Sequence, residues 1–259
     1  MSQPLGQSLD AIGARIDGAP ALLIALAYDG TLSPLADTPE QAELSAANRR
    51  LLRALARHAN VAVAVISGRE LGDLRAHIGL EEVIYIANHG LEIAGPGWSF
   101  VEPTAAASRD ALKELTADLA GRLATVPGAL VEDKGLTISV HDRLVRSELC
   151  EEVRQTVHGA LARASHPFQL TVGDRVYEIR PRVYWNKGSA VALVKEKIGK
   201  ADTLIVYVGD DATDEDAFTA LANDITIKVG AAETSAAHYQ VDSPAEVQRF
   251  LGWLAEHLG

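Results

Sequence analysis

Hydrophobic and polar positions along this chain follow two alternating patterns. Continuous apolar runs at residues 20–27, 61–66 and 83–87 predict strands, and the stretches between them carry apolar residues at helical spacing, such as Leu51 and Leu55. Strands that are apolar throughout are buried on both faces, and their alternation with helices is typical of a parallel sheet with helices on both sides. The pattern therefore predicts an α/β fold with a doubly wound parallel sheet.

The pattern changes after Pro103, where helices and strand pairs alternate. In order, the predicted elements are a helix at 112–123, strands on either side of Gly135, a helix at 149–161, and strands at 168–172 and 175–179 that turn at Gly173-Asp174. From Gly188 onward, a predicted helix and a strand at 203–208 resume the first pattern. We therefore expect a small α+β domain at 104–180, inserted into an α/β domain formed by 1–103 and 181–259.

Composition limits the partners that this chain can take. It has 259 residues, of which 47% are hydrophobic and 23% charged, and its formal net charge is −11. The acidic excess repels nucleic acid and anionic membranes, so an anionic ligand needs a local cluster of donors. The run at 20–27 is too short to span a bilayer, and the single cysteine, Cys150, suits a reducing cytoplasm. We expect a cytoplasmic monomer that binds neither nucleic acid nor membrane.

Carboxylates follow two of the predicted strands. Asp29 comes directly after the first strand, and Asp210, Asp211 and Asp214 follow a strand at 203–208. The carboxyl ends of parallel strands meet at the edge of the sheet where ligands bind. Crowded carboxylates are tolerated where a hard divalent cation holds them, and Mg²⁺ fits such oxygen ligands best. The alternatives are a polar turn after the strand and a solvated acidic start of a helix.

Two further segments supply groups that bind anions. Ser67 and Arg69 follow the strand at 61–66, and Lys187 precedes a helix. A hydroxyl, a helix N-terminus and an ammonium that converge on one point make a site suited to phosphate. Taken singly, the plainer explanations are a helix N-cap for Ser67 and a surface charge for Lys187.

Together, these four segments resemble the haloacid-dehalogenase (HAD) superfamily of phosphatases, in the order that this family requires. The first motif of the family is Asp-x-Asp-Gly-Thr, and here it reads Ala27-Tyr28-Asp29-Gly30-Thr31. The resemblance covers nearly the whole chain. It implies a HAD-like, Rossmann-type core with an inserted α+β cap domain.

The resemblance also implies a role for each matching position. Asp29 is the expected general acid and base, and Ser67 and Lys187 are expected to hold the transferring phosphoryl group. Mg²⁺ is the expected cofactor, held by the backbone carbonyl of Asp29 and by Asp210, with Asp214 in support.

The predicted insert carries charged residues at period-two spacing. These residues and a turn in the core resemble motifs of trehalose-6-phosphate phosphatases. With Arg69, the expected substrate contacts are Asn88, His89, Gly90, Glu132, Lys134, His141, Arg143, Glu178 and Arg180. Residues two apart on a strand share one face, which suits a polyhydroxylated sugar. The alternatives are cross-strand ion pairs on a solvated surface, a core position for His89 and a hinge role for Arg180.

The resemblance implies Mg²⁺-dependent hydrolysis of trehalose 6-phosphate through an aspartyl-phosphate. Ala27 stands where the attacking aspartate belongs, and a methyl group cannot attack phosphorus. We therefore expect this chain to bind its substrate without turning it over. Two origins are open, an Asp→Ala substitution introduced to trap substrate and a natural pseudophosphatase, and the intact remaining motifs favour the first. Sucrose phosphate, or a glucosyl or mannosyl glycerate phosphate, would require the same chemistry.

Overall fold

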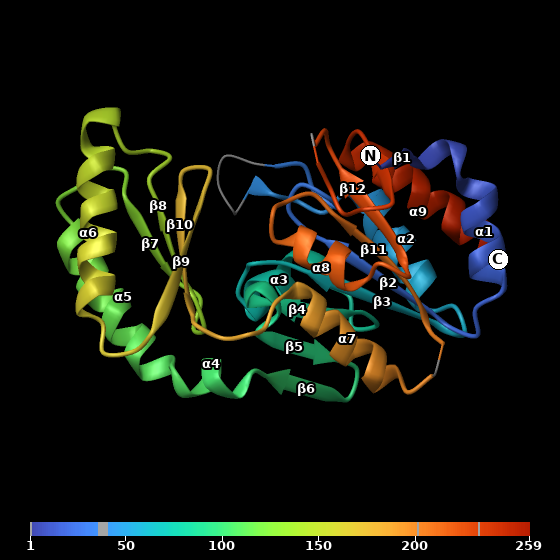
Figure 1. The fold of residues 1–259 in the computed structure, drawn as a ribbon, viewed down its shortest axis with the longest axis horizontal. Helices are drawn as coiled ribbons and strands as arrows, with labels where there is room; N and C mark the ends of the chain where they lie inside the picture. Colours follow the sequence, from blue (N-terminus) through green and yellow to red (C-terminus); the bar gives the residue numbers. More distant parts are fainter. Residues whose placement is uncertain (1, 36–40, 201, 233) are drawn as a thin grey trace. The chain divides into compact units, whose positions relative to one another are not determined.

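The chain folds into two compact units (Figure 1). The computed structural model describes residues 2–35, 41–200, 202–232 and 234–259. The core unit comprises Met1–Phe100 and Trp185–Gly259, and the cap unit comprises Val101–Tyr184. The cap unit thus begins at 101 instead of the predicted 104 and ends at 184 instead of the predicted 180.

A mostly parallel sheet lies at the centre of the core unit. Within the described residues, its spatial order is β1 (Gln3–Pro4), β13 (Tyr239–Val241), β12 (Ile225–Val229), β11 (Leu204–Gly209), β2 (Leu22–Ala27), β3 (Val61–Ile66), β4 (Ile84–Ala87), β5 (Glu92–Gly95) and β6 (Trp98–Val101). In this spatial order, all neighbouring strands from β1 across the sheet to β4 pair in parallel, and β5 pairs antiparallel with β4. The chain winds outward from β2 in both directions, which confirms the predicted doubly wound α/β fold.

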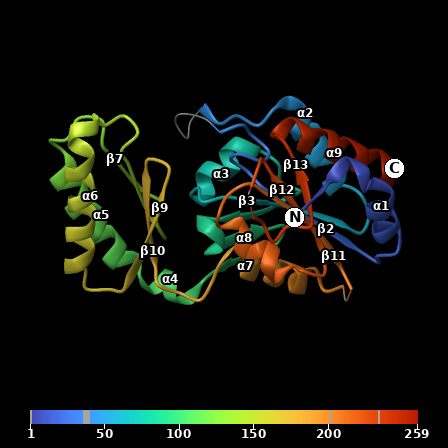
Figure 2. The same cartoon turned by 45° about the horizontal axis from the view of Figure 1, so that its top comes forward.

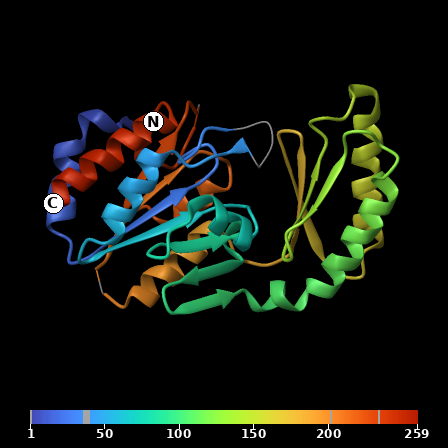
Figure 3. The same cartoon turned by 180° about the vertical axis from the view of Figure 1, so that it is seen from behind.

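Helices cover both faces of this sheet because its strands are apolar on both sides. On one face lie α1 (Leu9–Asp17), α2 (Ala46–Ala56), α3 (Leu71–Ile78) and α9 (Pro244–Leu258), and on the other lie α7 (Lys187–Ile198) and α8 (Asp214–Ala220). Ile24 and Leu26 of β2 pack with the first group, whereas Leu23 and Ala25 pack with the second. Figures 2 and 3 show α2 and α9 running side by side on their face. None of the helices in the described ranges is long and apolar enough to cross a membrane.

The cap unit is an antiparallel sheet with two helices on one face. Its strands, in spatial order, are β7 (Leu130–Asp133), β8 (Ile138–His141), β10 (Val176–Pro181) and β9 (Phe168–Gly173). The short α4 (Pro103–Ala107) leads into the packed helices α5 (Arg109–Leu123) and α6 (Cys150–Arg163). Leu119 of α5 and Val157 of α6 pack on Ile179. Because side chains alternate along a strand, Glu178 and Ser139 project from the opposite face.

The hairpin of the cap unit turns one residue later than the sequence predicts. The predicted turn is Gly173-Asp174, but β9 continues through Gly173, which pairs with Val176. The turn residues are therefore Asp174 and Arg175, and Arg175 adopts a left-handed φ of 61°. An ion pair of 3.1 Å between Arg175 and Asp142 holds the side chain of this turn residue.

Candidate active site

The predicted functional segments of the core unit meet at the carboxyl edge of its sheet. Strands β11, β2, β3 and β4 are neighbours, and the segments that follow them carry Asp210, Asp29, Ser67 and Asn88 respectively. This is the edge where parallel α/β sheets bind ligands. Ala27 is the last residue of β2, and it is buried there with an exposure of 3%.

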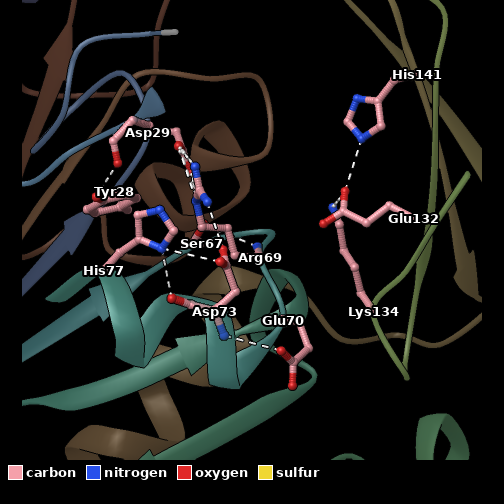
Figure 4. A network of polar contacts seen from close by, with 11 residues as sticks. Tyr28, Asp29, Ser67, Arg69, Glu70, Asp73, His77, Glu132, Lys134 and His141 are labelled. Atoms are coloured by element: carbon pink, nitrogen blue, oxygen red, sulfur yellow. Dashed lines mark hydrogen bonds and ion pairs between the residues drawn. The ribbon is translucent and has the colours of Figure 1, made fainter. Parts of the chain in front are cut away.

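Asp29 accepts hydrogen bonds from two neighbouring side chains (Figure 4). Ser67 Oγ donates to Asp29 Oδ2 over 3.1 Å. Arg69 donates through Nη2 to Oδ1 over 2.8 Å and through Nε to Oδ2 over 3.1 Å. The structure therefore joins the predicted acid and base to the predicted hydroxyl and guanidinium, and charge-assisted bonds of this length fix the orientation of the carboxylate.

Arg69 lies between two carboxylates and an aromatic ring. Its side chain is 7% exposed, and its Nη1 donates to Asp73 Oδ2 over 2.7 Å. The guanidinium carbon lies 5.3 Å from the centre of the Tyr28 ring. Burial opposes the charged form of Arg69, but the hydrogen bonds to Asp29 and Asp73 outweigh burial and raise its pKa. The structure therefore places Arg69 between Asp29 and Asp73, and its predicted contact with substrate stays a prediction.

Gly30 and Thr31 allow Asp210 to approach the end of β2. Thr31 Oγ1 donates to Asp210 Oδ1 over 2.8 Å. Gly30 has a φ of 76°, and a Cβ atom on it would lie 2.0 Å from Asp210 Oδ2. Asp210 therefore packs directly against the backbone that follows Asp29. Burial raises the pKa of Asp210 to about 7, and the negative charge of Asp214 adds to this shift.

Lys187 is a buried cation that binds two carboxylates, the buried Asp214 and the half-exposed Asp211. Its side chain is 4% exposed, and its Nζ donates to Asp214 over 2.7 Å and to Asp211 over 3.2 Å. The hydroxyl of Tyr207 donates to the same oxygen of Asp214 over 2.7 Å. Burial opposes the charged form of Lys187, but Asp214 and Asp211 outweigh it and raise the pKa. Lys187 is thus a buried cation of the site and not a surface charge.

The carboxylate of Asp214 accepts hydrogen bonds from the backbone of the loop before it. Oδ2 accepts the backbone N–H groups of Asp210 and Asp211 over 2.9 and 3.0 Å, while Oδ1 accepts Lys187 and Tyr207. With four donors bound, Asp214 fixes the loop that carries Asp210, and its predicted support of Mg²⁺ stays a prediction. Across residues 2–35, 41–200, 202–232 and 234–259, no three His, Cys, Asp or Glu side chains form a cluster that could hold a metal.

A strained turn after β4 places His89 against the loop that contains Ser67. Asn88, His89 and Gly90 have φ values of 49°, 58° and 99°, in the left-handed region that side chains rarely adopt. The backbone N–H of His89 donates to the carbonyl of Ser67 over 3.0 Å, and a Cβ on Gly68 would lie 2.5 Å from the His89 ring. Strain of this kind concentrates at functional sites, which favours a functional position for His89 over an ordinary core position.

A second polar cluster lies on the helix-free face of the cap sheet. Glu178 Oε1 accepts from Ser139 over 2.7 Å and from Lys134 over 3.2 Å. Glu132 lies 3.8 Å from Lys134, and its Oε2 lies 3.0 Å from His141 Nε2 (Figure 4). Burial favours the neutral form of Glu132, but His141 and Lys134 outweigh it and lower the pKa of that carboxyl. These cross-strand pairs are partly buried, unlike the solvated pairs of the alternative interpretation.

Two further predicted cap residues contact the hairpin of β9 and β10. Arg143 Nη2 pairs with Asp174 over 2.9 Å at the hairpin turn. Arg180 Nη2 donates to Thr171 Oγ1 over 3.0 Å on the neighbouring strand. Among the predicted cap residues, the structure joins Glu132, Lys134, His141 and Glu178 in one cluster.

Sequence reasoning missed three residues that support these sites. Lys228 is 8% exposed in β12, and its Nζ donates to the backbone carbonyl of Asp210. Ser139 donates to Glu178, and Asp73 pairs with Arg69. A lysine within the apolar stretch of β12 was a usable signal because isolated buried charges require partners. Asp73 and Ser139 follow ordinary helix and strand patterns, so nothing in the sequence marks them as functional residues.

Comparison with known proteins agrees with this geometry. The trehalose-phosphate phosphatase of Mycobacterium marinum is 35% identical over 265 residues, which cover 98% of this chain and 67% of that protein. Trehalose 6-phosphate phosphatase RA3 of Zea mays is 34% identical over 258 residues, covering 92% and 71%. A solved structure described as a trehalose-6-phosphate phosphatase related protein superposes with a TM-score of 0.80 at 25% identity, covering 90% of this chain and 97% of that one.

The family model for trehalose-phosphatases matches residues 25–247. The match begins within β2, includes the whole cap unit and ends within α9, so it contains both polar clusters. This chain belongs to the trehalose-phosphatase family.

Proposed function

We propose that this chain carries the binding and proton-transfer groups of a trehalose 6-phosphate phosphatase without the attacking carboxylate. One observation carries the proposal: Ser67 and Arg69 hold the carboxylate of Asp29 at the end of β2, two residues beyond Ala27. An attacking group at position 27 and a proton donor at Asp29 would then share one strand end. The site is then built for phosphoryl transfer, and the missing carboxylate at position 27 alone prevents the reaction.

Asp29 is suited to the transfer of a proton to a leaving sugar oxygen. Its side chain is 36% exposed, so a ligand atom can approach it, while Ser67 and Arg69 fix its orientation. A carboxyl held in this way can donate a proton to the departing oxygen and later accept one from water. General acid catalysis of this kind contributes about 10²–10⁴-fold to a reaction rate.

Lys187 is suited to hold a phosphoryl oxygen. An ammonium group carries three donors, and Asp214 and Asp211 take one each. The third donor can bind a phosphoryl oxygen, and the two carboxylates keep the ammonium charged and in place. Ser67 Oγ lies beside Asp29, and its one O–H would bind the same group by donating to a phosphoryl oxygen instead of to Asp29.

Mg²⁺ is the proposed cofactor. The carboxylate of Asp210 lies against Gly30, the residue after Asp29, where a Cβ would not fit, and we infer that Mg²⁺ would take one oxygen from Asp210 and the backbone carbonyl of Asp29. Mg²⁺ takes few protein oxygens and keeps several water ligands, so this pair of oxygens suits it. When bound, Mg²⁺ neutralises charge on a phosphoryl group. Ala27 offers no oxygen, so we expect weaker Mg²⁺ binding than in an Ala27→Asp variant.

The polar face of the cap sheet is the proposed sugar-binding surface. Glu178, Glu132 and His141 offer acceptors and donors within a few ångströms of one another, and Lys134 links the two carboxylates. Sugar hydroxyls need both kinds of partner, since each can donate and accept. The family membership favours trehalose as the sugar.

Binding of trehalose 6-phosphate to this chain tests the proposal. Titration calorimetry in the presence of Mg²⁺ should detect binding, and phosphate analysis of the same solution after a day should detect no hydrolysis. Absence of binding, or hydrolysis by the Ala27 chain, would contradict the proposal. A panel of sugar phosphates, which includes sucrose phosphate and glucosyl glycerate phosphate, separates trehalose 6-phosphate from its relatives when applied to an Ala27→Asp variant.

A further inference from the structure

A chain of contacts links the start of α3 to Asp29. Arg69 binds Asp29 through Nε and Nη2 and binds Asp73 through Nη1 (Figure 4). Tyr28 lies against the face of the same guanidinium, and its own hydroxyl donates to the carbonyl of Ala42 over 2.6 Å. The planar fork of Arg69 is thus held along two edges and one face, which leaves it a single orientation.

The backbone of Arg69 is fixed as well as its side chain. Its N–H donates to Ser67 Oγ over 3.2 Å, and its carbonyl accepts from the N–H of Asn88 over 2.8 Å. Arg69 therefore lies in the loop after β3 and is hydrogen-bonded to the segment after β4. Its partner Asp73 lies on the α-helix α3.

Asp73 is held by its own helix. It occupies the third position of α3, where its N–H donates to the side chain of the N-cap residue Glu70 over 3.2 Å. One turn later, His77 Nδ1 lies 3.3 Å from Asp73 Oδ1 and 2.9 Å from the Asp73 carbonyl. A residue tied to a helix at both its backbone and its side chain is a rigid anchor.

We propose that Asp73 is a positioning residue for the proton transfer at Asp29, and that it acts by anchoring Arg69. The inference rests on the proposed function, in which Asp29 protonates the leaving oxygen. Asp73 is 42% exposed on its side chain and its charge is therefore partly screened, so its effect is on geometry. Without it, the Nη1 edge of Arg69 loses its anchor, and Arg69 no longer presents a fixed fork to Asp29.

Loss of the Asp73 anchor should lower kcat/KM by an amount that depends on the leaving group. A displaced proton donor matters for a sugar alkoxide, which departs only when protonated, and matters little for an aryl phosphate, which releases a stable phenolate. A misplacement of about 1 Å in an active site can cost about 10²-fold in rate. We therefore expect a loss of about 10- to 100-fold with trehalose 6-phosphate and less than about threefold with 4-nitrophenyl phosphate.

The test compares Asp73→Ala, which removes the acceptor of Arg69 Nη1, with a matched control in an Ala27→Asp background. The control is Asp10→Ala, which changes an exposed aspartate in the first turn of another core helix, α1. The expected result is a selective fall in kcat/KM for trehalose 6-phosphate in Asp73→Ala, with an unchanged inhibition constant for inorganic phosphate. Equal losses with both substrates, or no loss with either, would overturn the proposal, because a general structural defect does not discriminate between leaving groups.

A second measurement uses the chain as it is and does not depend on activity. In the Ala27 protein, NMR of ¹⁵N-labelled arginine should show slow rotation of the Arg69 guanidinium because both edges are bound. Asp73→Ala should accelerate that rotation, and Asp10→Ala should leave it unchanged. Identical Arg69 signals in Asp73→Ala and the parent would refute the anchoring role. If the Ala27→Asp variant is inactive, the proposed function fails, while this spectrum still decides whether Asp73 anchors Arg69.

Discussion

Replacing Asp210 by asparagine should change how the stability of the core unit depends on pH. In the metal-free protein, burial and the charge of Asp214 raise the pKa of Asp210 from 3.8 to about 7. A carboxyl with a raised folded-state pKa stabilises the fold below its unfolded pKa, and this stabilisation is lost as the pH rises through the folded-state pKa. Between pH 5 and pH 7 the loss is about 1.4 kcal/mol per unit, or about 3 kcal/mol in total.

Asparagine does not titrate, so the variant escapes this loss. The free energy of unfolding of Asp210→Asn, measured relative to the parent, should therefore rise by about 3 kcal/mol between pH 5 and pH 8. Urea denaturation followed by tryptophan fluorescence reports on the right part of the molecule, because Trp98, Trp185 and Trp253 all belong to the core unit. Mg²⁺ should reverse the effect at pH 8 by stabilising only the parent, whose ionised Asp210 binds it.

The control for this experiment is Asp216→Asn, which replaces an exposed aspartate in the first turn of α8. It should shift the stability by the same small amount at both pH values. If Asp210→Asn also gives a constant difference from the parent between pH 5 and pH 8, burial does not raise the pKa of Asp210. The explanation of the acidic loop as a site that requires a cation would then be wrong.

Three further predictions concern the buried charges, the metal and the sugar. Lys187→Met should lower the free energy of unfolding by about 3–5 kcal/mol, because it leaves Asp214 buried without its cation. Adding Asp214→Asn should recover much of this loss in the same urea assay. Gly30→Ala should abolish Mg²⁺ binding in calorimetry, since its Cβ would overlap Asp210, whereas Gly97→Ala, with a similar φ of 80° and open space around it, should keep it. Glu178→Gln should weaken binding of trehalose 6-phosphate about tenfold and leave binding of inorganic phosphate unchanged, as competition assays can establish; equal weakening of both ligands would contradict the assignment of the cap cluster to the sugar.

The sequence predicts the parallel part of the fold well because its strands are buried on both faces. The run at 61–66 coincides with β3, and the glycine and aspartates after 203–208 mark the end of β11. The antiparallel strands β5 and β6 escape prediction. They have four residues each, and β6 is only partly buried, so their pattern of apolar residues is too short to distinguish from a loop.

The candidate site is predictable where chemistry requires a residue type and unpredictable where geometry decides its partner. The sequence identifies Asp29 and Ser67 from their places after strands and Lys187 from its place before a helix, and the structure joins each to a network of charges. It does not reveal that Arg69 binds Asp29 or that Asp214 binds its own loop. These contacts depend on side-chain directions and distances, which residue spacing alone does not determine.

The most direct test of the central claim is one substitution and one assay. Ala27→Asp restores a carboxylate at the end of β2, two residues before Asp29, and the rest of the site is unchanged. The variant should release phosphate from trehalose 6-phosphate in the presence of Mg²⁺, while the parent and an Ala27→Asn variant should not. A folded Ala27→Asp protein that binds trehalose 6-phosphate and Mg²⁺ but releases no phosphate would contradict the claim that this chain lacks only its attacking group.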